Sequence, residues 1–128
     1  MKKFFLLLLL ASASVTAQTS NESVLQKSLK PWRPLSINDN GGIITMVTNE
    51  DRVTPQVYES IILMGVCVPF LSQNAHVWYL KNTSEVHVLN RFGRNGFAFE
   101  SPRKSCKEVA QSKGDDAGLV ISTYTHNL

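Results

Sequence analysis

The sequence predicts an α+β fold: a small antiparallel sheet with a three-strand meander, two helices packed on it, and one disulfide. Three observations favour this class. Alternating apolar segments separated by turn residues fill positions 75–101. Helix starts are indicated at Thr54 and Ser101, because each hydroxyl residue is followed by proline. Two cysteines, Cys67 and Cys106, follow a leader that indicates export.

Residues 1–17 are predicted to form a secretory signal peptide. Lys2 and Lys3 provide a positive start, and an unbroken apolar run follows at 4–10. The small residues before Gln18 suit cleavage. The run is too short to span a bilayer, which takes a helix of about 20 residues. We therefore expect an exported protein, periplasmic or secreted, with no transmembrane segment after processing.

Length and charge limit what the mature chain can be. Removal of the leader from the 128 residues leaves 111, which suits one domain. The full chain has 13 Lys and Arg against 10 Asp and Glu. Because Lys2 and Lys3 leave with the leader, the mature chain has 11 against 10, a formal charge of +1. This balance gives no reason to expect a nucleic-acid partner.

The two cysteines are predicted to form a disulfide between Cys67 and Cys106. An even number of cysteines in an exported chain favours this pairing. The bridge would close a loop of about 40 residues and stabilise the fold by roughly 4 kcal/mol in the chain-entropy model. A free reactive thiol is the alternative, but Cys67 lies within the apolar run 61–71, which indicates burial.

The domain organisation predicted for the mature chain is a flexible arm at 18–34 followed by a single α+β domain at 35–128. Polar residues dominate the arm, and Pro31 and Pro34 favour extended backbone. Trp32 has two interpretations. It either packs the arm onto the domain or serves as an exposed aromatic anchor for a partner.

The first elements of the domain are a strand and a helix. The β-branched run at 43–47 follows a turn-forming cluster at 38–42, and it predicts a strand. Apolar residues at helical spacing predict a central buried helix from Thr54 to Val68. A buried strand from 61 to 68 is the alternative. We expect Pro69 to end either element.

The three-strand meander is expected between residues 75 and 101. Segments 76–81 and 85–91 alternate, and a loop at 82–84 would pair them as a hairpin. A second turn at 93–96 precedes a strand that contains Phe97 and Phe99. The hairpin register places Trp78, Leu80, Val86 and Val88 on one face, and Val77, Tyr79, His87 and Leu89 on the other.

The last two elements are predicted to be a helix and a closing strand. The helix should run from Ser101 to about Ser112 and direct Cys106 and Val109 toward the core. Residues 118–124 are rich in β-branched side chains and predict the closing strand. The disulfide would then join the end of the first helix to the first turns of the second.

Catalytic and metal-binding patterns are weak. His76 and His87 lie on opposite faces in the predicted hairpin, and His126 is close to the terminus, so no metal site is predicted. A thiol–imidazole pair of Cys67 and His87 would need an unbridged, exposed cysteine. No serine elbow or phosphate-binding glycine loop is present, and we expect no cofactor.

A basic and aromatic group in the second half is the one candidate for partner binding. A solvated polar rim is the simpler interpretation. The alternative is a site for an acidic partner surface or an anionic glycan, and Arg and aromatic side chains are enriched in protein interfaces. Residues that flank the second hairpin turn should lie at the opposite end of a strand from those that begin the last helix. The tentative partner-binding residues are Arg91, Phe92, Arg94, Arg103 and Lys104.

The leading hypothesis is an exported, non-enzymatic protein that binds another protein in the envelope or outside the cell. An inhibitor, an immunity-type protein and an accessory subunit of an envelope machine are all compatible with it. The alternative is a small periplasmic protein that binds a ligand or glycan, with possible hydrolase activity through His87. A cavity beside His87 and Tyr79 would favour this alternative. A subunit that assembles through an open sheet edge is the third class.

Overall fold

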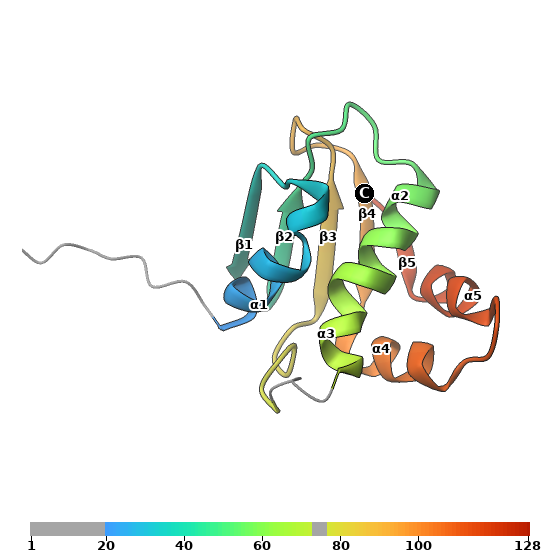
Figure 1. Ribbon diagram of the computed structural model, residues 1–128. Helices are drawn as coiled ribbons and strands as arrows, with labels where there is room; N and C mark the ends of the chain where they lie inside the picture. Colours follow the sequence, from blue (N-terminus) through green and yellow to red (C-terminus); the bar gives the residue numbers. More distant parts are fainter. Residues whose placement is uncertain (1–19, 73–76) are drawn as a thin grey trace, which may run out of the picture.

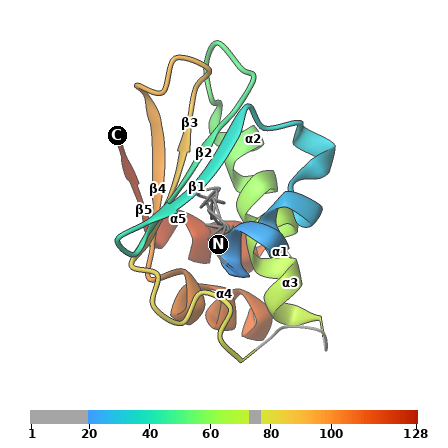
Figure 2. The same cartoon turned by 90° about the vertical axis from the view of Figure 1, so that its left-hand side faces the viewer.

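A computed structural model describes residues 20–72 and 77–128 of the chain. One sheet forms the first layer, and helices cover one of its faces to form the second (Figures 1 and 2). The strands follow in the spatial order β1-β2-β3-β4-β5. They are β1 Ser36–Asn40, β2 Ile43–Val47, β3 Glu85–Leu89, β4 Gly96–Glu100 and β5 Thr125–Asn127. The α+β class is confirmed.

The sheet is mixed, so the prediction of a wholly antiparallel sheet is wrong. β2 and β3 run parallel, with Ile44 beside Val86 and Met46 beside Val88. The other neighbouring strands pair antiparallel. Parallel neighbours need a long crossover, and the chain provides one in the helical stretch between β2 and β3. The strand predicted at 43–47 is confirmed as β2.

The crossover contains a helical stretch from Pro55 to Leu71. Its parts are α2 Pro55–Ser60, the π-helix η2 Ile61–Cys67 and α3 Val68–Leu71. The Thr54 hydroxyl accepts a hydrogen bond from the Val57 amide at 3.2 Å, so the predicted N-cap is confirmed. The strand alternative for this segment is wrong.

Pro69 does not end the helix, contrary to the prediction. In the π-helical segment the Val68 amide donates to the Leu63 carbonyl, five residues back. A new α-helical turn then begins at Val68, and Pro69 occupies its second position, where a missing N–H group is tolerated. The helix ends at Leu71, and the amide of the next residue, Ser72, donates to the Val68 carbonyl.

The predicted three-strand meander is only partly present. β3 and β4 form the second hairpin as predicted, but residues 77–80 form turns. Tyr79 and Leu80 are consecutive and both buried, at 1% and 0% exposure, which a strand with one open face does not allow. Leu80 also has a positive φ of 59°. Positions 75 and 76 lie outside the described residues.

The extended backbone predicted for the N-terminal arm is wrong for residues 20–32, which are largely helical. Ser20–Ser28 form α1, and Lys30–Trp32 form a short 3-10 turn, η1. Leu25 and Leu29 belong to the hydrophobic core and are almost fully buried. Trp32 packs against the same core, which agrees with the tether interpretation. Residues 1–19, including the predicted signal peptide, lie outside the described residues.

The C-terminal part contains two helices and the last strand. The predicted helix is confirmed as α4, Pro102–Gln111. The segment predicted as a closing strand is wrong, because it forms α5, Asp116–Thr123, and the strand β5 follows it. Asp116 in the first turn interacts favourably with the helix dipole, and Ile121 is buried against the core.

The core lies between the sheet and the helices. Ile44 and Met46 of β2, and Val86 and Val88 of β3, face the helical layer. The disulfide Cys67–Cys106 joins the end of η2 to α4, with a Cα–Cα distance of 5.1 Å. Both cysteines are fully buried. The predicted bridge is confirmed. None of the helices in the described ranges is both long and apolar enough to cross a membrane.

Candidate functional site

Two loops meet at the end of the sheet where β2 and β3 finish. Because these strands are parallel, the chain leaves Val47 and Leu89 at the same edge. The first loop, residues 48–54, leads into α2, and the second, residues 90–95, turns into β4. Figure 1 shows both loops at the top of the molecule. We call residues 48–54 and 90–95 together the double loop.

Arg91 joins the two halves of the double loop. Its Nε lies 2.9 Å from the Asp51 carboxylate, and its Nη2 donates to the Asn49 carbonyl at 2.9 Å. Its backbone amide donates to the Glu50 carbonyl at 2.8 Å. Three bonds from one residue therefore fix the second loop against the first.

Buried polar side chains order the same loops from beneath. The Asn90 amide oxygen accepts hydrogen bonds from the Arg94 and Asn95 amides at 3.1 and 3.4 Å. Asn90 and Thr48 are nearly fully buried, and the Thr48 hydroxyl donates to the Leu89 carbonyl at 2.9 Å. Such side-chain bonds hold a turn in a single conformation. The double loop is therefore ordered before it meets any partner.

Phe92 projects from this ordered frame. Its side chain is 63% exposed, although large aromatic side chains are usually well buried in a folded domain. Arg94 is also exposed, and within the described chain its guanidinium has no carboxylate partner. A cleft of about 460 Å³ lies between the double loop and the end of β5; Asn90 and Asn95 line it, whereas Phe92 and Arg94 do not. The double loop thus combines an exposed ring, an available cation and a recess.

The five residues predicted to bind a partner do not form one surface. Arg91, Phe92 and Arg94 lie in the turn that precedes β4, whereas Arg103 and Lys104 begin the helix that follows it. The two groups are therefore at opposite ends of this strand. The sequence prediction that these positions lie apart agrees with the fold, and only the first three belong to the double loop.

The Arg103 guanidinium is bound by other groups of the same chain. Its Nη1 donates to the carbonyls of Val77 and Tyr79 at 2.8 and 3.0 Å. Its guanidinium also lies 5.5 Å from the centre of the Phe70 ring, within the range of a cation–π contact. The Lys104 ammonium lies 5.9 Å from the centre of the Tyr124 ring. Arg103 therefore holds the segment 77–80 in place.

The two described histidines each contact a glutamate. His87 Nε2 lies 2.8 Å from Glu85 Oε1, and His126 Nδ1 lies 2.8 Å from Glu100 Oε2. His76 lies outside the described residues. The disulfide rules out the thiol–imidazole pair of Cys67 and His87. In the part of the chain that the structure describes, no three His, Cys, Asp or Glu side chains converge to hold a metal ion.

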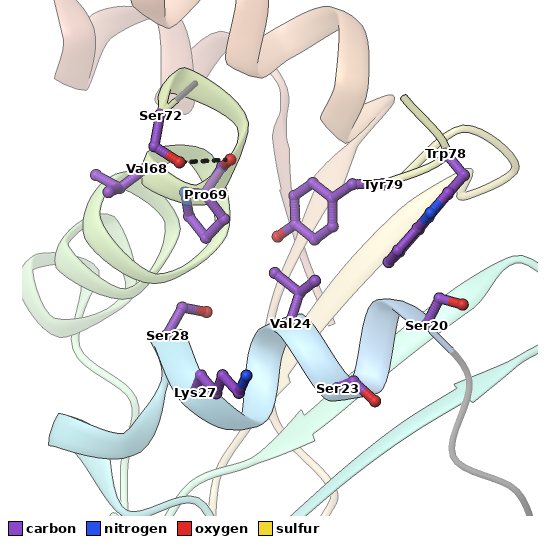
Figure 3. A pocket seen from close by; sticks show the side chains of 10 residues that line it. All are labelled: Ser20, Ser23, Val24, Lys27, Ser28, Val68, Pro69, Ser72, Trp78 and Tyr79. Atoms are coloured by element: carbon purple, nitrogen blue, oxygen red, sulfur yellow. Dashed lines mark hydrogen bonds between the residues drawn. The ribbon is translucent and has the colours of Figure 1, made fainter. Parts of the chain in front are cut away.

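A larger cavity, about 650 Å³, lies between α1 and α3 (Figure 3). The ligand-binding alternative would be favoured by a cavity beside both His87 and Tyr79; Tyr79 lines this cavity, but His87 does not. The α1 side of this cavity does not follow from the prediction of a flexible arm at 18–34. The spacing of Leu25 and Leu29, four residues apart, was the signal that could have indicated a packed helix.

Burial changes the titration of two tyrosines near these sites. Removal from water raises the pKa of Tyr79 far above its usual range, and its hydroxyl donates to the Val66 carbonyl at 2.8 Å. Burial also raises the pKa of Tyr58, whose hydroxyl lies 2.7 Å from the Thr125 hydroxyl; the nearby Glu100 charge adds to the rise. Both phenols therefore remain neutral at physiological pH.

Comparison of the chain with protein-family models, curated proteins and solved structures finds no match. The geometry of the double loop and of the cavity is therefore the basis for assigning a function.

Proposed function

We propose that the chain is an exported, non-enzymatic protein that binds another protein through the double loop. The observation that carries this proposal is the exposure of Phe92 at the tip of a loop fixed by Arg91 and Asn90. An exposed aromatic side chain on an ordered loop binds at low entropic cost, because little backbone freedom is lost. Aromatic and Arg side chains supply most of the binding energy in many interfaces.

The expected partner surface has an apolar recess for Phe92 and an acidic group for Arg94. Arg94 is available for such a contact, whereas Arg91 is already paired with Asp51. An inhibitor, an immunity-type protein and an accessory subunit of an envelope machine would all use a surface of this kind. The predicted leader and the buried disulfide support an oxidising location, periplasmic or extracellular.

The test is a pull-down of binding partners from native extract. Four forms of the mature protein are compared: wild type, Phe92→Ala, Arg94→Glu and Leu119→Ala. Leu119 on α5 is 68% exposed and outside the double loop, so it is a matched control for loss of an exposed apolar side chain. We expect a partner that wild type and Leu119→Ala retain equally. Phe92→Ala should weaken its binding by at least about 30-fold, as a hot-spot residue of about 2 kcal/mol would.

Equal capture by wild type and Phe92→Ala would contradict the assignment of the double loop. A partner lost equally in Phe92→Ala and Leu119→Ala would indicate adhesion through any exposed apolar side chain.

Binding of a small ligand is a separate candidate function, which the cavity between α1 and α3 favours. The possible hydrolase role of His87 gains no support from that cavity, because His87 does not line it.

A further inference from the structure

The cavity between α1 and α3 is lined by both apolar and polar side chains, and none of them belongs to the double loop. Figure 3 shows Val24 and Lys27 on the α1 side, Pro69 on the α3 side, and the rings of Tyr79 and Trp78 along a third side. Its volume of about 650 Å³ is in the usual range for small-molecule sites, roughly 300–1,000 Å³. Figure 1 shows α1 and α3, the helices between which this cavity lies, below the end of the molecule that carries the double loop.

Among the described residues that line the cavity, Lys27 is the one with a charged side chain. No carboxylate of residues 20–72 or 77–128 lies within ion-pair distance of its ammonium group. A ligand with an anionic group would therefore meet an available cation without competing with an internal partner. Charge complementarity of this kind favours a carboxylate or another anion near Lys27.

Hydroxyl groups define the polar part of the lining. The hydroxyl of Ser28 donates a hydrogen bond to the Leu25 carbonyl at 3.5 Å, and that of Ser72 donates one to the Pro69 carbonyl at 3.2 Å. Their oxygens keep acceptor lone pairs, which can receive hydrogen bonds from a ligand. A ligand with hydroxyl or amide donors as well as an anionic group would therefore find partners in this lining.

The apolar part of the lining is open to solvent. Trp78 and Val68 are 37% and 38% exposed, so the cavity is a shallow recess rather than an enclosed tunnel. The exposed indole ring offers a flat apolar face, against which the C–H face of a sugar ring can pack. A fatty-acid chain would keep much of its surface in water in such a recess, which removes most of the hydrophobic gain.

From these contacts we infer that the cavity binds an acidic sugar, as a monosaccharide or as a unit of a short glycan. The carboxylate pairs with Lys27, sugar hydroxyls donate to Ser28 and Ser72, and the ring packs on Trp78. This site does not depend on the double loop, so either assignment can fail without the other.

The test is titration of the disulfide-bonded mature protein with galacturonic acid and with N-acetylmuramic acid. Galactose and N-acetylglucosamine are the neutral counterparts, and decanoate represents a fatty acid. Amide and indole resonances in two-dimensional NMR report both affinity and location. We expect the acidic sugars to shift the Trp78 indole and the α1 amides, and to bind at least tenfold more tightly than the neutral sugars.

Lys27→Ala should weaken binding of the acidic sugar about tenfold, while leaving the spectrum of the folded protein otherwise unchanged. Lys30→Ala is the matched control, because Lys30 is exposed nearby and does not line the cavity. If Lys27→Ala and Lys30→Ala weaken binding of the acidic sugar equally, the sugar is attracted by positive charge in general, and the inference is overturned. Tighter binding of decanoate, or no shift at Trp78 with any sugar, would overturn it as well.

Discussion

At the scale of single residues, Arg103 shows how a charged side chain can have a structural role. From the sequence, Arg103 belongs with the exposed basic residues that could meet a partner. In the fold it donates to two backbone carbonyls of the segment 77–80. Sequence pattern gives the charge of a side chain, but it does not show which carbonyls a distant turn leaves available. Leu80 in this segment has a positive φ, and such a turn needs outside support.

Arg103→Ala should therefore destabilise the protein by about 1.5–3 kcal/mol, the range for hydrogen bonds to a charged group. Lys104→Ala is the matched control, because Lys104 is the next residue and is exposed. The free energy of unfolding from urea denaturation measures both variants. An Arg103→Ala variant as stable as Lys104→Ala would contradict the structural role of Arg103.

Tyr79 gives a pH dependence whose sign follows from its burial. Its pKa is raised in the folded chain above the usual value of 10.0, so the folded state holds the phenol proton more tightly than the unfolded state. This contribution to stability is fully present below about pH 10 and falls as the pH rises further. Tyr58 acts in the same direction, because burial also raises its pKa.

Urea midpoints measured from pH 8 to pH 11 should therefore fall above about pH 10. Tyr79→Phe removes one ionisable phenol, so its midpoint should fall less steeply over the same range, even though the loss of the bond to Val66 lowers it at pH 8. Parallel curves for wild type and Tyr79→Phe would show that Tyr79 does not titrate on unfolding in this range.

At the scale of elements, the packing of α1 on η2 depends on Gly65. A Cβ atom at Gly65 would lie 2.3 Å from Leu29 Cδ2, and Leu29 is almost fully buried. The absence of a side chain at position 65 therefore lets the residues after α1 approach the π-helical segment. This contact does not follow from local sequence pattern, because Leu29 is 36 residues away from Gly65 in the chain.

Gly65→Ala should destabilise the protein by about 1–3 kcal/mol through overpacking, although alanine is the better helix former. The effect should be local, so amide exchange should increase in α1 more than in β3. Unfolding in urea and native-state hydrogen exchange measure the two effects. A more stable Gly65→Ala variant would indicate that helix propensity dominates and that Leu29 can move aside.

Elements with their own local signals were predicted well. β2, the β3–β4 hairpin and α4 have clear alternation, turn residues or a hydroxyl–proline start, and all three are confirmed. α5 was predicted as a strand because β-branched residues favour strands, but packing on the core overrides that preference. α1 was missed because only Leu25 and Leu29 mark its buried side.

At the scale of the whole molecule, strand order was beyond local patterns. The parallel pairing of β2 and β3 joins residues about 40 positions apart, and it brings the two halves of the double loop together. The sequence therefore indicated Arg91, Phe92 and Arg94 as candidates, but not the frame formed by Asp51, Asn49 and Glu50. The disulfide was predictable because an even number of cysteines and a predicted export leader together indicate it.

Reduction of the Cys67–Cys106 bridge should lower the free energy of unfolding by up to about 4 kcal/mol, since the loop spans a sequence separation of 39. Both sulfurs are buried, so alkylation should require denaturant as well as reductant. Denaturation with and without a reducing agent measures the difference. Equal stability of the oxidised and reduced forms would show that packing alone holds η2 against α4.

The most direct test of the central claim is site-specific photo-crosslinking in the native host. A photoreactive phenylalanine analogue placed at Phe92 should form one discrete crosslinked product with another protein. The same analogue at Leu119, equally exposed but on α5, should form none. Crosslinking at Phe92 should also be lost when Arg94→Glu is combined with it. The same products from both positions, or none from Phe92, would contradict a role of the double loop in binding a partner.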